Sequence, residues 1–456
     1  MVAGDQSDPV DVLIIGAGPG GYVAALRAAQ LGRSVTLVEA ARVGGVCLNE
    51  GCIPSKQLGR FAAAKAAVER LAVAGMPGLA GAPDLLAFHR QSREAVTTLV
   101  KGVELLLKAA GVVVVKGEAR FVGRTRVCVQ VGEESVRYFD FKDVVIATGS
   151  EPISVAELPF SGDRVVTPSQ ALQWDRLPAS LLVVGDDYVG LEIAVAYSRL
   201  GSQVMMAVPG DRLLPDFDAD LSAVAMRGAR IARVAVRLNA APKDDPTCER
   251  VVVSAGRRPK LGVLDLAAAG IGRSAGPLVV DAQLRLDRHV FAIGDVTPGL
   301  LLAHRAMMQG RVVGEVLGGR NAALDATAFP RAVFVEPEIA SVGLTEEAAA
   351  ASGREISVGR FPLMALGRAV IEPGTHGFAK LVFEAGGGPL LGAHLAGPRS
   401  TELIAEMALA IEMGATAEDL ALTVHAHPTF AEALMEAAEV SLGRPIHVRP
   451  PRPPAT

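Results

Sequence analysis

The sequence predicts an α/β protein with two Rossmann-like nucleotide-binding domains and a third domain of mixed strands and helices. Near the N-terminus, an apolar run over residues 11–15 precedes a glycine-rich turn and a helical stretch, which is the pattern of a nucleotide-binding βαβ unit. Residues 181–200 repeat this strand, turn and helix. From residue 331 onward, strands and helices follow one another without a glycine fingerprint, so we expect a third, α+β domain there.

The first glycine-rich turn has the composition of a dinucleotide site. Gly16, Gly18 and Gly21 follow the pattern G-x-G-x-x-G. The first forms the turn, the second lets the backbone approach the phosphates, and the third lets helix and strand pack closely. Glu39 ends the next predicted strand, where an acid can accept a hydrogen bond from a ribose hydroxyl. A tight turn without a ligand is the alternative, but the strand, helix, second strand and acid in this order favour a dinucleotide.

Two cysteines follow this unit, in a run flanked by glycine, proline and serine. Cys47 and Cys52 are five residues apart, and the chain of 456 residues has four cysteines. So few cysteines in a long chain argue against a disulfide scaffold and for a catalytic or metal-binding pair. A structural zinc site needs two further ligands, and none has a plausible spacing. A thiol pair beside a redox cofactor predicts electron transfer between a dithiol and that cofactor.

The second glycine-rich turn departs from the first at two positions. Its middle glycine position holds Asp187, whose side chain and charge oppose a pyrophosphate. The acid expected at the end of the following strand is replaced by Val208. The domain is also short, because residues 209–250 leave room for roughly one helix, one strand and a polar loop. We therefore expect a shortened domain with a degenerate nucleotide site.

Composition and charge exclude several classes of protein. The formal net charge is -4, which gives no sign of nucleic-acid or acidic-membrane binding. Residues 1–5 lack the basic and apolar regions of a signal peptide. The most apolar stretch, residues 12–26, is interrupted by glycine and proline, which argues against a membrane span. We expect a cytoplasmic enzyme without a membrane or nucleic-acid partner.

Several motifs occur in one order along the chain and together resemble the class I FAD-dependent pyridine nucleotide-disulfide oxidoreductases. They are the cysteine run 47–56, Ala-Thr-Gly-Ser at 147–150, Ala-Gly-Arg-Arg-Pro at 255–259, Ala-Ile-Gly-Asp at 292–295 and His-Ala-His-Pro-Thr-Phe-Ala-Glu at 425–432. Within this family the cysteine run and Gly-Arg-Pro-Ile-His at 443–447 are most similar to the dihydrolipoamide dehydrogenases. The resemblance covers residues 10–448 and is weakest over 185–250.

The resemblance implies an order of domains. An FAD-binding domain would comprise residues 1–150 and 263–330, and a shortened, degenerate NAD-type domain would comprise residues 151–262. A dimerisation domain would follow over residues 331–448, and the proline-rich residues 449–456 would form a flexible tail. The family's active sites are shared between two subunits, so a homodimer is expected.

The resemblance also implies roles for individual residues. Cys52 matches the thiol beside the flavin, and Cys47 matches the thiol that exchanges with the substrate. His427 matches the catalytic base, which the other subunit of the dimer supplies, and Glu432 matches the residue that orients this base. The residues that match the cofactor-binding positions are Gly16, Gly18, Gly21, Glu39, Lys56, Thr148, Gly149 and Asp295.

The chemistry of the side chains agrees with these roles. A thiol at the start of a helix has its thiolate favoured by the positive helix end, and the thiolate is the nucleophile. A dithiol that attacks a disulfide must lose protons, which requires a positioned histidine. Glu432, five residues after His427, can hold the second nitrogen of the imidazole. A purely structural histidine is the alternative for His427, and the carboxylate and the cysteine pair favour catalysis.

The same resemblance implies that the second domain keeps the residues that face the flavin and has lost those that bind the nucleotide. Lys56 and Glu192, which pair near the flavin ring in the family, are both present, and Tyr188 matches a residue over the flavin's nicotinamide face in some relatives. The nucleotide side has lost its glycine and its acid, and no basic cluster for a 2′-phosphate replaces them. Two smaller departures are Gln309, where an acid is usual, and Leu366, where asparagine is usual.

Three functions are compatible with these observations. We favour a flavoprotein that takes electrons from a small dithiol, or from a lipoyl-type group on a carrier protein, through Cys47 and Cys52 to FAD without NAD(P). The electrons would leave to oxygen, a quinone or another redox protein. The first alternative is an ordinary NAD-dependent dihydrolipoamide dehydrogenase that tolerates a degenerate site. The second is a non-catalytic FAD-binding subunit, against which the intact cysteines, His427 and Glu432 speak.

Overall fold

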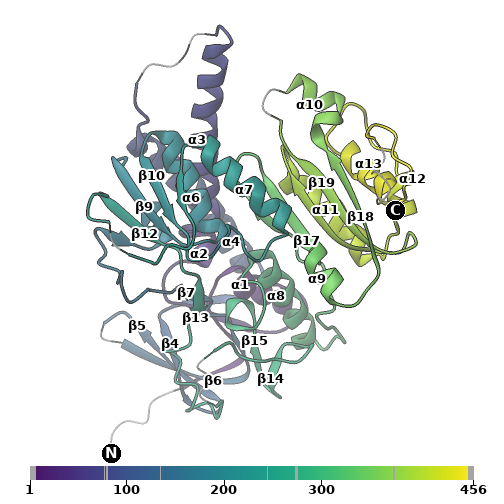
Figure 1. Cartoon of the computed structure of the whole chain (residues 1–456). Coiled ribbons are helices and arrows are strands. Elements are labelled where there is room, and N and C mark those ends of the chain that lie inside the picture. Colours follow the sequence, from purple (N-terminus) through teal and green to yellow (C-terminus); the bar gives the residue numbers. More distant parts are fainter. Residues whose placement is uncertain are drawn as a thin grey trace, which may run out of the picture.

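The computed structural model describes residues 7–449, apart from residues 77, 79–80, 134, 244, 273–275 and 373–374. The expectation of no signal peptide concerns residues 1–5, which lie outside the described residues. The expected flexible tail over residues 449–456 also lies outside them, except for residue 449. Three large sheets define three parts of the molecule, and the C-terminal part lies beside the other two (Figure 1). The fold is mixed α/β, as predicted.

The first sheet is built from two separate stretches of the chain. A hairpin of β4 (Glu118–Gly123) and β5 (Arg126–Val131) extends it. The strands at its centre run parallel, as in a Rossmann-like domain. The main strand order is β14 (Arg285–Asp287), β15 (Val290–Ala292), β6 (Ser135–Ile146), β1 (Ser7–Ile15), β2 (Val35–Glu39) and β3 (Val113–Lys116).

Strand β6 is longer than the sequence pattern predicts. The sequence pattern predicts two separate strands over residues 136–139 and 144–150. In the structure, one strand of 12 residues pairs in parallel with β1 and antiparallel with β5 over its first half. Asp140 and Asp143 do not break the strand, since Arg126 Nε and Arg33 Nη2 bind their carboxylates at 2.7 Å.

Helices α1 (Pro19–Gln30) and α8 (Ala303–Leu317) pack against each other and share the apolar core of the first sheet. The two helices approach closely because α8 carries Gly310 at the crossing. A Cβ atom at this position would lie 2.3 Å from the carbonyl oxygen of Gly20. The start of α1 follows β1 directly, at the edge of the sheet where ligands bind in such folds.

The end of helix α3 (Cys52–Val73) forms the projection at the top of Figure 1, and α4 (Leu85–Ala109) follows it along the chain. The sequence pattern predicts a helix over residues 60–73, and in the structure this helix already starts at Cys52. Pro54 stands in the first turn of the helix, where proline is tolerated because the backbone N–H has no partner within the helix. The Cys52 thiol therefore lies at a helix start.

The second sheet is parallel throughout and smaller than the first. It is accompanied by α5 (Pro168–Ala171), α6 (Tyr188–Leu200) and α7 (Ala219–Ile231). Between its last two strands along the chain, the described residues of 238–249 form neither helix nor strand. The strand order is β11 (Ala235–Arg237), β10 (Gln203–Ala207), β9 (Ser180–Val184), β12 (Arg250–Val253) and β8 (Val165–Val166).

A small ribbon connects these two sheets. It consists of β7 (Ser150–Pro152) and β13 (Arg257–Pro259), which pair antiparallel. The first strand follows β6 on the way out of the first sheet, and the second follows β12 on the way out of the second. The ribbon therefore holds together the two points at which the chain passes between these parts.

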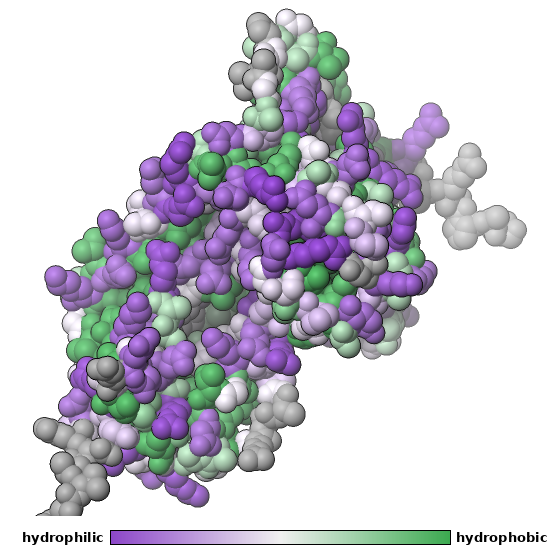
Figure 2. Space-filling view, turned by 90° about the vertical axis from the view of Figure 1, so that its left-hand side faces the viewer, coloured by the Kyte–Doolittle hydropathy of each residue, from purple (hydrophilic) through white to green (hydrophobic). Residues whose placement is uncertain are grey.

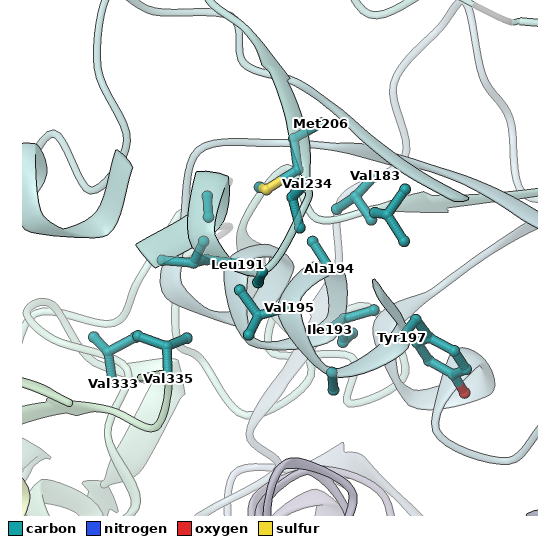
Figure 3. Close-up of a cluster of buried hydrophobic side chains, with 14 of the residues drawn as sticks. Val183, Leu191, Ile193, Ala194, Val195, Tyr197, Met206, Val234, Val333 and Val335 are labelled. Carbon is teal, nitrogen blue, oxygen red and sulfur yellow. The ribbon is translucent and has the colours of Figure 1, made fainter. Parts of the chain in front are cut away.

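Helix α6 lies at the centre of the second part's core. Leu191 and Val195 are buried, and Figure 3 shows them between Val183 of β9 on one side and Val333 and Val335 on the other. The last two residues lie at the start of the third part. Because α6 is apolar on both sides, it joins the second sheet to the third part through one continuous core.

The third sheet is antiparallel. Helices α11 (Ser400–Glu412), α12 (Ala417–Leu422) and α13 (Glu432–Ser441) share its apolar core, and a short helix α9 (Glu346–Ala351) follows β17. This mixture of strands and helices is the α+β arrangement expected for the third domain. The strand order is β16 (Arg331–Val333), β17 (Ile339–Gly343), β20 (Leu390–Ala396), β19 (Phe378–Glu384) and β18 (Ile356–Pro362).

The surface is mixed in polarity. Figure 2 shows hydrophilic residues over much of one face, with smaller hydrophobic areas between them. Scattered exposed apolar residues of this kind are normal for a folded chain. Within the described part of the chain, no helix has both the length and the apolar character needed to cross a membrane.

A buried group of charges fastens the second part to the third. Lys380 of β19 is 4% exposed, and its Nζ lies 3.0 Å from Oδ1 of the fully buried Asp218, which caps α7. The same nitrogen lies 3.1 Å from Asp220 Oδ2 and 2.6 Å from Glu346 Oε2. Burial alone would lower the pKa of Lys380, but the hydrogen bonds to Glu346 and Asp218 raise it. The lysine is therefore held in its charged form.

Replacing Lys380 by methionine leaves Asp218 buried without its cation. We expect a loss of about 3–5 kcal/mol in the free energy of unfolding. Urea unfolding can be followed by the fluorescence of Trp174, the one tryptophan of the chain, at fixed protein and FAD concentrations. The control is Lys142→Met, since this lysine is 77% exposed and pairs with Asp11 across 3.4 Å. The control should lose less than about 1 kcal/mol, and equal losses in both variants would contradict the buried role.

Candidate functional site

A cleft of about 780 Å³ runs from the first part of the molecule into the second. It begins at the ends of β1 and β2 and reaches the start of α6. Three predicted residues do not line it: Gly21 lies behind the turn, and His427 and Glu432 lie before and at the start of α13. The predicted residues that do line it are Gly16, Gly18, Glu39, Cys47, Cys52, Lys56, Thr148, Gly149 and Asp295.

The turn before α1 leaves space for phosphate groups. Gly16 has a φ of +105°, and a Cβ atom there would lie 2.3 Å from the carbonyl oxygen of Ala147. A Cβ atom at Gly21 would lie 1.9 Å from the oxygen of Gly16, so helix and strand could not pack as they do. Beside Gly18, in contrast, the space is open, and no side chain caps the helix. The N–H groups at the start of α1 are therefore available to an anion in the cleft.

Glu39 is held rigidly at the end of β2. Its Oε2 accepts a hydrogen bond from the Ala17 N–H at 2.7 Å, and its Oε1 accepts one from the Ala41 N–H at 2.8 Å. Each carboxylate oxygen has a second lone pair, so the side chain can still accept a hydrogen bond from a ribose hydroxyl in the cleft. The geometry thus suits the predicted contact.

The two thiols are unequal. Cys47 lies in the short helix α2 (Gly45–Asn49), and Cys52 is the first residue of α3. The hydrogen bond from Cys47, together with the charge of Lys56, lowers the pKa of Cys52, while that same bond and burial raise the pKa of Cys47. The positive end of α3 acts in the same direction on Cys52. In the reduced pair, the thiolate form is therefore favoured at Cys52 over Cys47.

Lys56 and Glu192 meet at the junction of all three parts. Lys56 Nζ lies 2.8 Å from Glu192 Oε2, and Glu192 Oε1 also accepts the backbone N–H of Phe334 at 3.0 Å. The Phe334 ring packs against the Lys56 ammonium, 4.7 Å from nitrogen to centroid. Glu192 from α6 and Phe334 after β16 thus fix the position of the lysine of α3 beside Cys52.

Asp295 stands in the 3₁₀ turn η1 (Gly294–Val296) after β15, and its Oδ2 accepts the Ser150 hydroxyl at 2.6 Å. The turn is supported from α8 by Gln309, whose Oε1 accepts the Gly294 N–H at 2.7 Å. The glutamine therefore supplies the acceptor that an acid would supply at this position. The second small departure, Leu366, is buried in the apolar core of the third part.

His427 and Glu432 form the predicted pair on the third part. His427 Nδ1 donates to Glu432 Oε1 at 2.7 Å, and the Thr429 N–H donates to Glu432 Oε2 at 2.8 Å. Burial alone would raise the pKa of Glu432, but the hydrogen bonds from His427 and Thr429 lower it. With Nδ1 donating to this carboxylate, Nε2 carries the lone pair of the neutral ring, and the imidazole is 73% exposed in the single chain. His425 differs, since Glu406 and the Thr423 carbonyl engage both of its nitrogens.

Comparison with known proteins places these features in a family. Residues 10–310 match the model of the pyridine nucleotide-disulphide oxidoreductases, and residues 329–438 match that of the pyridine nucleotide-disulphide oxidoreductase dimerisation domain. The chain belongs to this family. It is therefore a flavoprotein disulfide oxidoreductase similar to dihydrolipoamide dehydrogenase, with an FAD site and a domain that forms dimers in the family.

Individual relatives agree with this assignment. The dihydrolipoyl dehydrogenase of Geobacillus stearothermophilus is 41% identical, over 98% of this chain and 99% of its own length. That of Bacillus subtilis is 40% identical, over 98% and 100%. Among solved structures, LpdA from Mycobacterium tuberculosis has a TM-score of 0.87 at 27% identity, covering 94% of this chain and 99% of its own. The HOCl-induced flavoprotein disulfide reductase RclA from Escherichia coli has a TM-score of 0.82 at 26% identity, covering 93% and 98%.

The second Rossmann-like turn of this oxidoreductase is closed by its own side chain. Asp187 caps α6: its Oδ1 accepts the Gly190 N–H at 2.8 Å and the Ser254 hydroxyl at 2.7 Å. Burial raises the pKa of Asp187, and the two hydrogen bonds act against this rise. The carboxylate thus occupies the position at the start of α6 that is open at the start of α1.

Sequence reasoning missed three polar residues that line the cleft. Ser254 holds Asp187, and Ser150 and Arg257 are linked to Asp295. Ser150 and Arg257 belong to motifs that carry the family resemblance, but the motifs alone assign them no partner. Ser254 has no signal in the sequence, because its contact depends on where β12 ends relative to α6.

Replacing Cys47 by alanine removes the hydrogen-bond donor to Cys52 and is expected to raise the Cys52 pKa. A depressed thiol pKa means that the thiolate persists above that pKa and is lost as the pH falls through it. The thiolate range of the reduced protein should therefore move to higher pH. Cys47→Ser keeps a donor and should shift the range less. The ultraviolet absorbance of the thiolate, titrated against pH, measures both variants, and identical curves would show that the hydrogen bond is unimportant.

Proposed function

We propose that this protein oxidises a dithiol through Cys47, Cys52 and FAD, and that it delivers the electrons to an acceptor other than NAD(P). Electron transfer from a dithiol to FAD is in keeping with the family. The acceptor other than NAD(P) is what this proposal adds. The observation that carries it is the contrast between two helix starts. The start of α1 is open beside Gly18, whereas Asp187 caps the start of α6. A dinucleotide phosphate at α6 would have to displace this carboxylate and would be repelled by its charge.

The ribose side of the second turn also differs from a nucleotide site. Val208, at the position of the expected acid, is fully buried and has no polar atom for a ribose hydroxyl. Its N–H donates to the Arg237 carbonyl at 2.9 Å, and its own carbonyl accepts the Ala240 N–H at 2.9 Å. The backbone after β11 therefore pairs with the chain beyond the end of β10, where an adenosine ribose lies in a Rossmann fold.

The residues present fit FAD. The open start of α1 suits the pyrophosphate, Glu39 suits a ribose hydroxyl, and Asp295 lines the stretch of cleft between this turn and the thiols. When bound, FAD supplies a two-electron acceptor beside Cys52. Lys56, fixed by Glu192, places a positive charge at the same end of the cleft.

The thiol chemistry starts from the oxidised pair. A substrate thiolate attacks Cys47, the bond between the two cysteine sulfurs breaks, and Cys52 leaves as a thiolate stabilised by Lys56. The second substrate thiol then attacks the mixed disulfide, so that the substrate leaves as a disulfide and Cys47 is reduced. His427 of the partner subunit takes one substrate proton through Nε2, while Glu432 fixes the ring, and the second substrate proton goes to Cys47, which becomes a thiol. The substrate loses two electrons, and the cysteine pair gains them.

We also propose a lipoyl-type dithiol as the substrate and a homodimer as the assembly. The names of the relatives favour a lipoyl-type dithiol, free or carried on a protein. The dimerisation domain favours a homodimer, and His427, absent from the cleft of its own chain, favours a site shared between subunits. A cytoplasmic location remains an expectation from the sequence.

An ordinary NAD-dependent dihydrolipoamide dehydrogenase is the second candidate. The relatives at about 40% identity carry that name over their full length. This reading requires a nicotinamide nucleotide to bind in a pose that avoids Asp187 and does without an acid at Val208. The two readings share the dithiol half of the reaction and differ in the acceptor.

Opening the second turn should create nicotinamide use. In the double variant Asp187→Gly, Val208→Glu, we expect NADH to reduce the flavin about tenfold faster than in the unmodified protein, because the capping charge is gone from the helix start. The control is Asp186→Gly with Val208→Glu, which changes a neighbouring acid that does not cap α6. Anaerobic stopped-flow absorbance measures the rates. If the unmodified protein already reacts with NADH as fast as the double variant, the proposed acceptor is wrong.

A site shared between subunits can be tested by mixing two inactive variants. Cys47→Ser and His427→Gln should each lose most dithiol oxidation, because one lacks the exchanging thiol and the other the base. Random exchange of subunits gives half mixed dimers, each with one complete site, so activity should return to about a quarter of that of the unmodified protein. Each variant remixed with itself is the control. No recovery, despite subunit exchange verified by mass, would place both groups in one chain's site.

A further inference from the structure

The Arg-Arg-Pro motif lies on the ribbon between the first two parts, and its first arginine points into the cleft. Arg257 lines the cleft, whereas Arg258 pairs with Glu151 on the outside, where the two side chains are 67% and 40% exposed. Neighbouring residues of one type therefore have different surroundings. The difference raises the question of what the inner arginine does.

Arg257 holds Ser150 with two hydrogen bonds. Its Nε donates to Ser150 Oγ at 2.7 Å, and its Nη2 donates to the Ser150 carbonyl oxygen at 2.7 Å. Ser150 is 7% exposed, and its Oγ lies 2.6 Å from Asp295 Oδ2. The three residues form one chain of hydrogen bonds, which runs from β13 through β7 to the turn after β15.

The direction of this chain follows from the chemistry of a hydroxyl group. Serine has one O–H hydrogen and two lone pairs. Because the guanidinium can only donate, it occupies a lone pair of Ser150 Oγ, and the single hydrogen is directed to Asp295. The carboxylate is thereby held by Oδ2, while Oδ1 has no hydrogen-bond partner within the described part of the chain, and Asp295 itself lines the cleft.

We propose that Arg257 is a positioning residue that orients Asp295 toward FAD through Ser150. The inference rests on the FAD contact of Asp295 in the proposed function. Arg257 does not contact Asp295 directly. It fixes the direction of the Ser150 hydrogen and places a positive charge near the Asp295 carboxylate. Hydrogen bonds that involve a charged group are the stronger kind, so loss of the guanidinium should be felt at the flavin site.

This role gives the second part of the molecule a use that does not depend on a nicotinamide nucleotide. Arg257 follows the last strand of the second sheet, and Glu192 on α6 holds Lys56. Both residues act on the flavin side of the cleft. A protein that had no need of the nucleotide at α6 would still need this part to position Lys56 and Asp295.

The affinity of the apoprotein for FAD tests the role. We expect Arg257→Gln to raise the FAD dissociation constant about tenfold, which corresponds to one charge-assisted hydrogen bond. Arg258→Gln, the matched control, should leave it unchanged, because this arginine contacts Glu151 at the surface. Quenching of flavin fluorescence on titration with apoprotein measures both, and Trp174 fluorescence reports whether each variant is folded. Equal affinities for the two variants would overturn the proposal.

A double-mutant cycle separates positioning from general support of the fold. If Arg257 acts through Ser150, the variant Ser150→Ala should weaken FAD binding to a similar degree, and adding Arg257→Gln to it should have little further effect. Additive losses would overturn the chain of hydrogen bonds. Arg257→Lys, which keeps a donor, should recover part of the affinity, and no recovery in a folded protein would count against the proposal.

Asp295→Asn distinguishes failure of this inference from failure of the proposed function. If that variant binds FAD as tightly as the unmodified protein, Asp295 does not contact FAD as proposed, and the role of Arg257 falls with it. If Asp295→Asn weakens binding while Arg257→Gln does not, the FAD contact stands and only the positioning role is refuted.

Discussion

The N–H groups at the start of a helix need an acceptor, and the two Rossmann-like turns of this chain meet that need in opposite ways. At α1 the turn is open beside Gly18, and an anionic ligand can supply the acceptor. At α6 the chain supplies its own acceptor in Asp187, held in place by Ser254. The same fold element thus serves as a binding site in one part and as internal structure in the other. The electron acceptor that we propose rests on this difference.

The second part is nevertheless tied firmly to the rest of the molecule. Its helix α6 shares one apolar core with the start of the third part, and Lys380 bridges the third sheet to Asp218. Glu192 reaches back to Lys56 beside the thiols, and Arg257 reaches Ser150. These contacts point toward the flavin side of the cleft or into the core, and none of them involves the turn at Asp187. The second part of the molecule can therefore position residues for the dithiol half of the reaction.

Local signals in the sequence predicted much of this site. The glycine pattern places Gly16 and Gly18 at a cofactor turn, because only glycine tolerates the backbone and the close approach there. The side chain and the charge of Asp187 predict a second turn that opposes a pyrophosphate. What the sequence does not contain are contacts between distant segments: Ser254 on Asp187, Ser150 on Asp295, and the pairing beyond β10 that buries Val208. The helix pattern over residues 60–73 likewise does not show that this helix is continuous from Cys52, with Pro54 in its first turn.

The most direct measurement concerns the reduced form of the unmodified protein. The protein is reduced anaerobically with just enough dihydrolipoamide to bleach the flavin, and NAD⁺ or oxygen is then added to separate samples while the flavin absorbance is followed. A closed turn at α6 predicts that NAD⁺ leaves the flavin bleached, while another acceptor such as oxygen or a quinone restores it. Rapid return of the yellow colour on adding NAD⁺, with formation of NADH, would contradict the account and make the protein an ordinary NAD-linked enzyme.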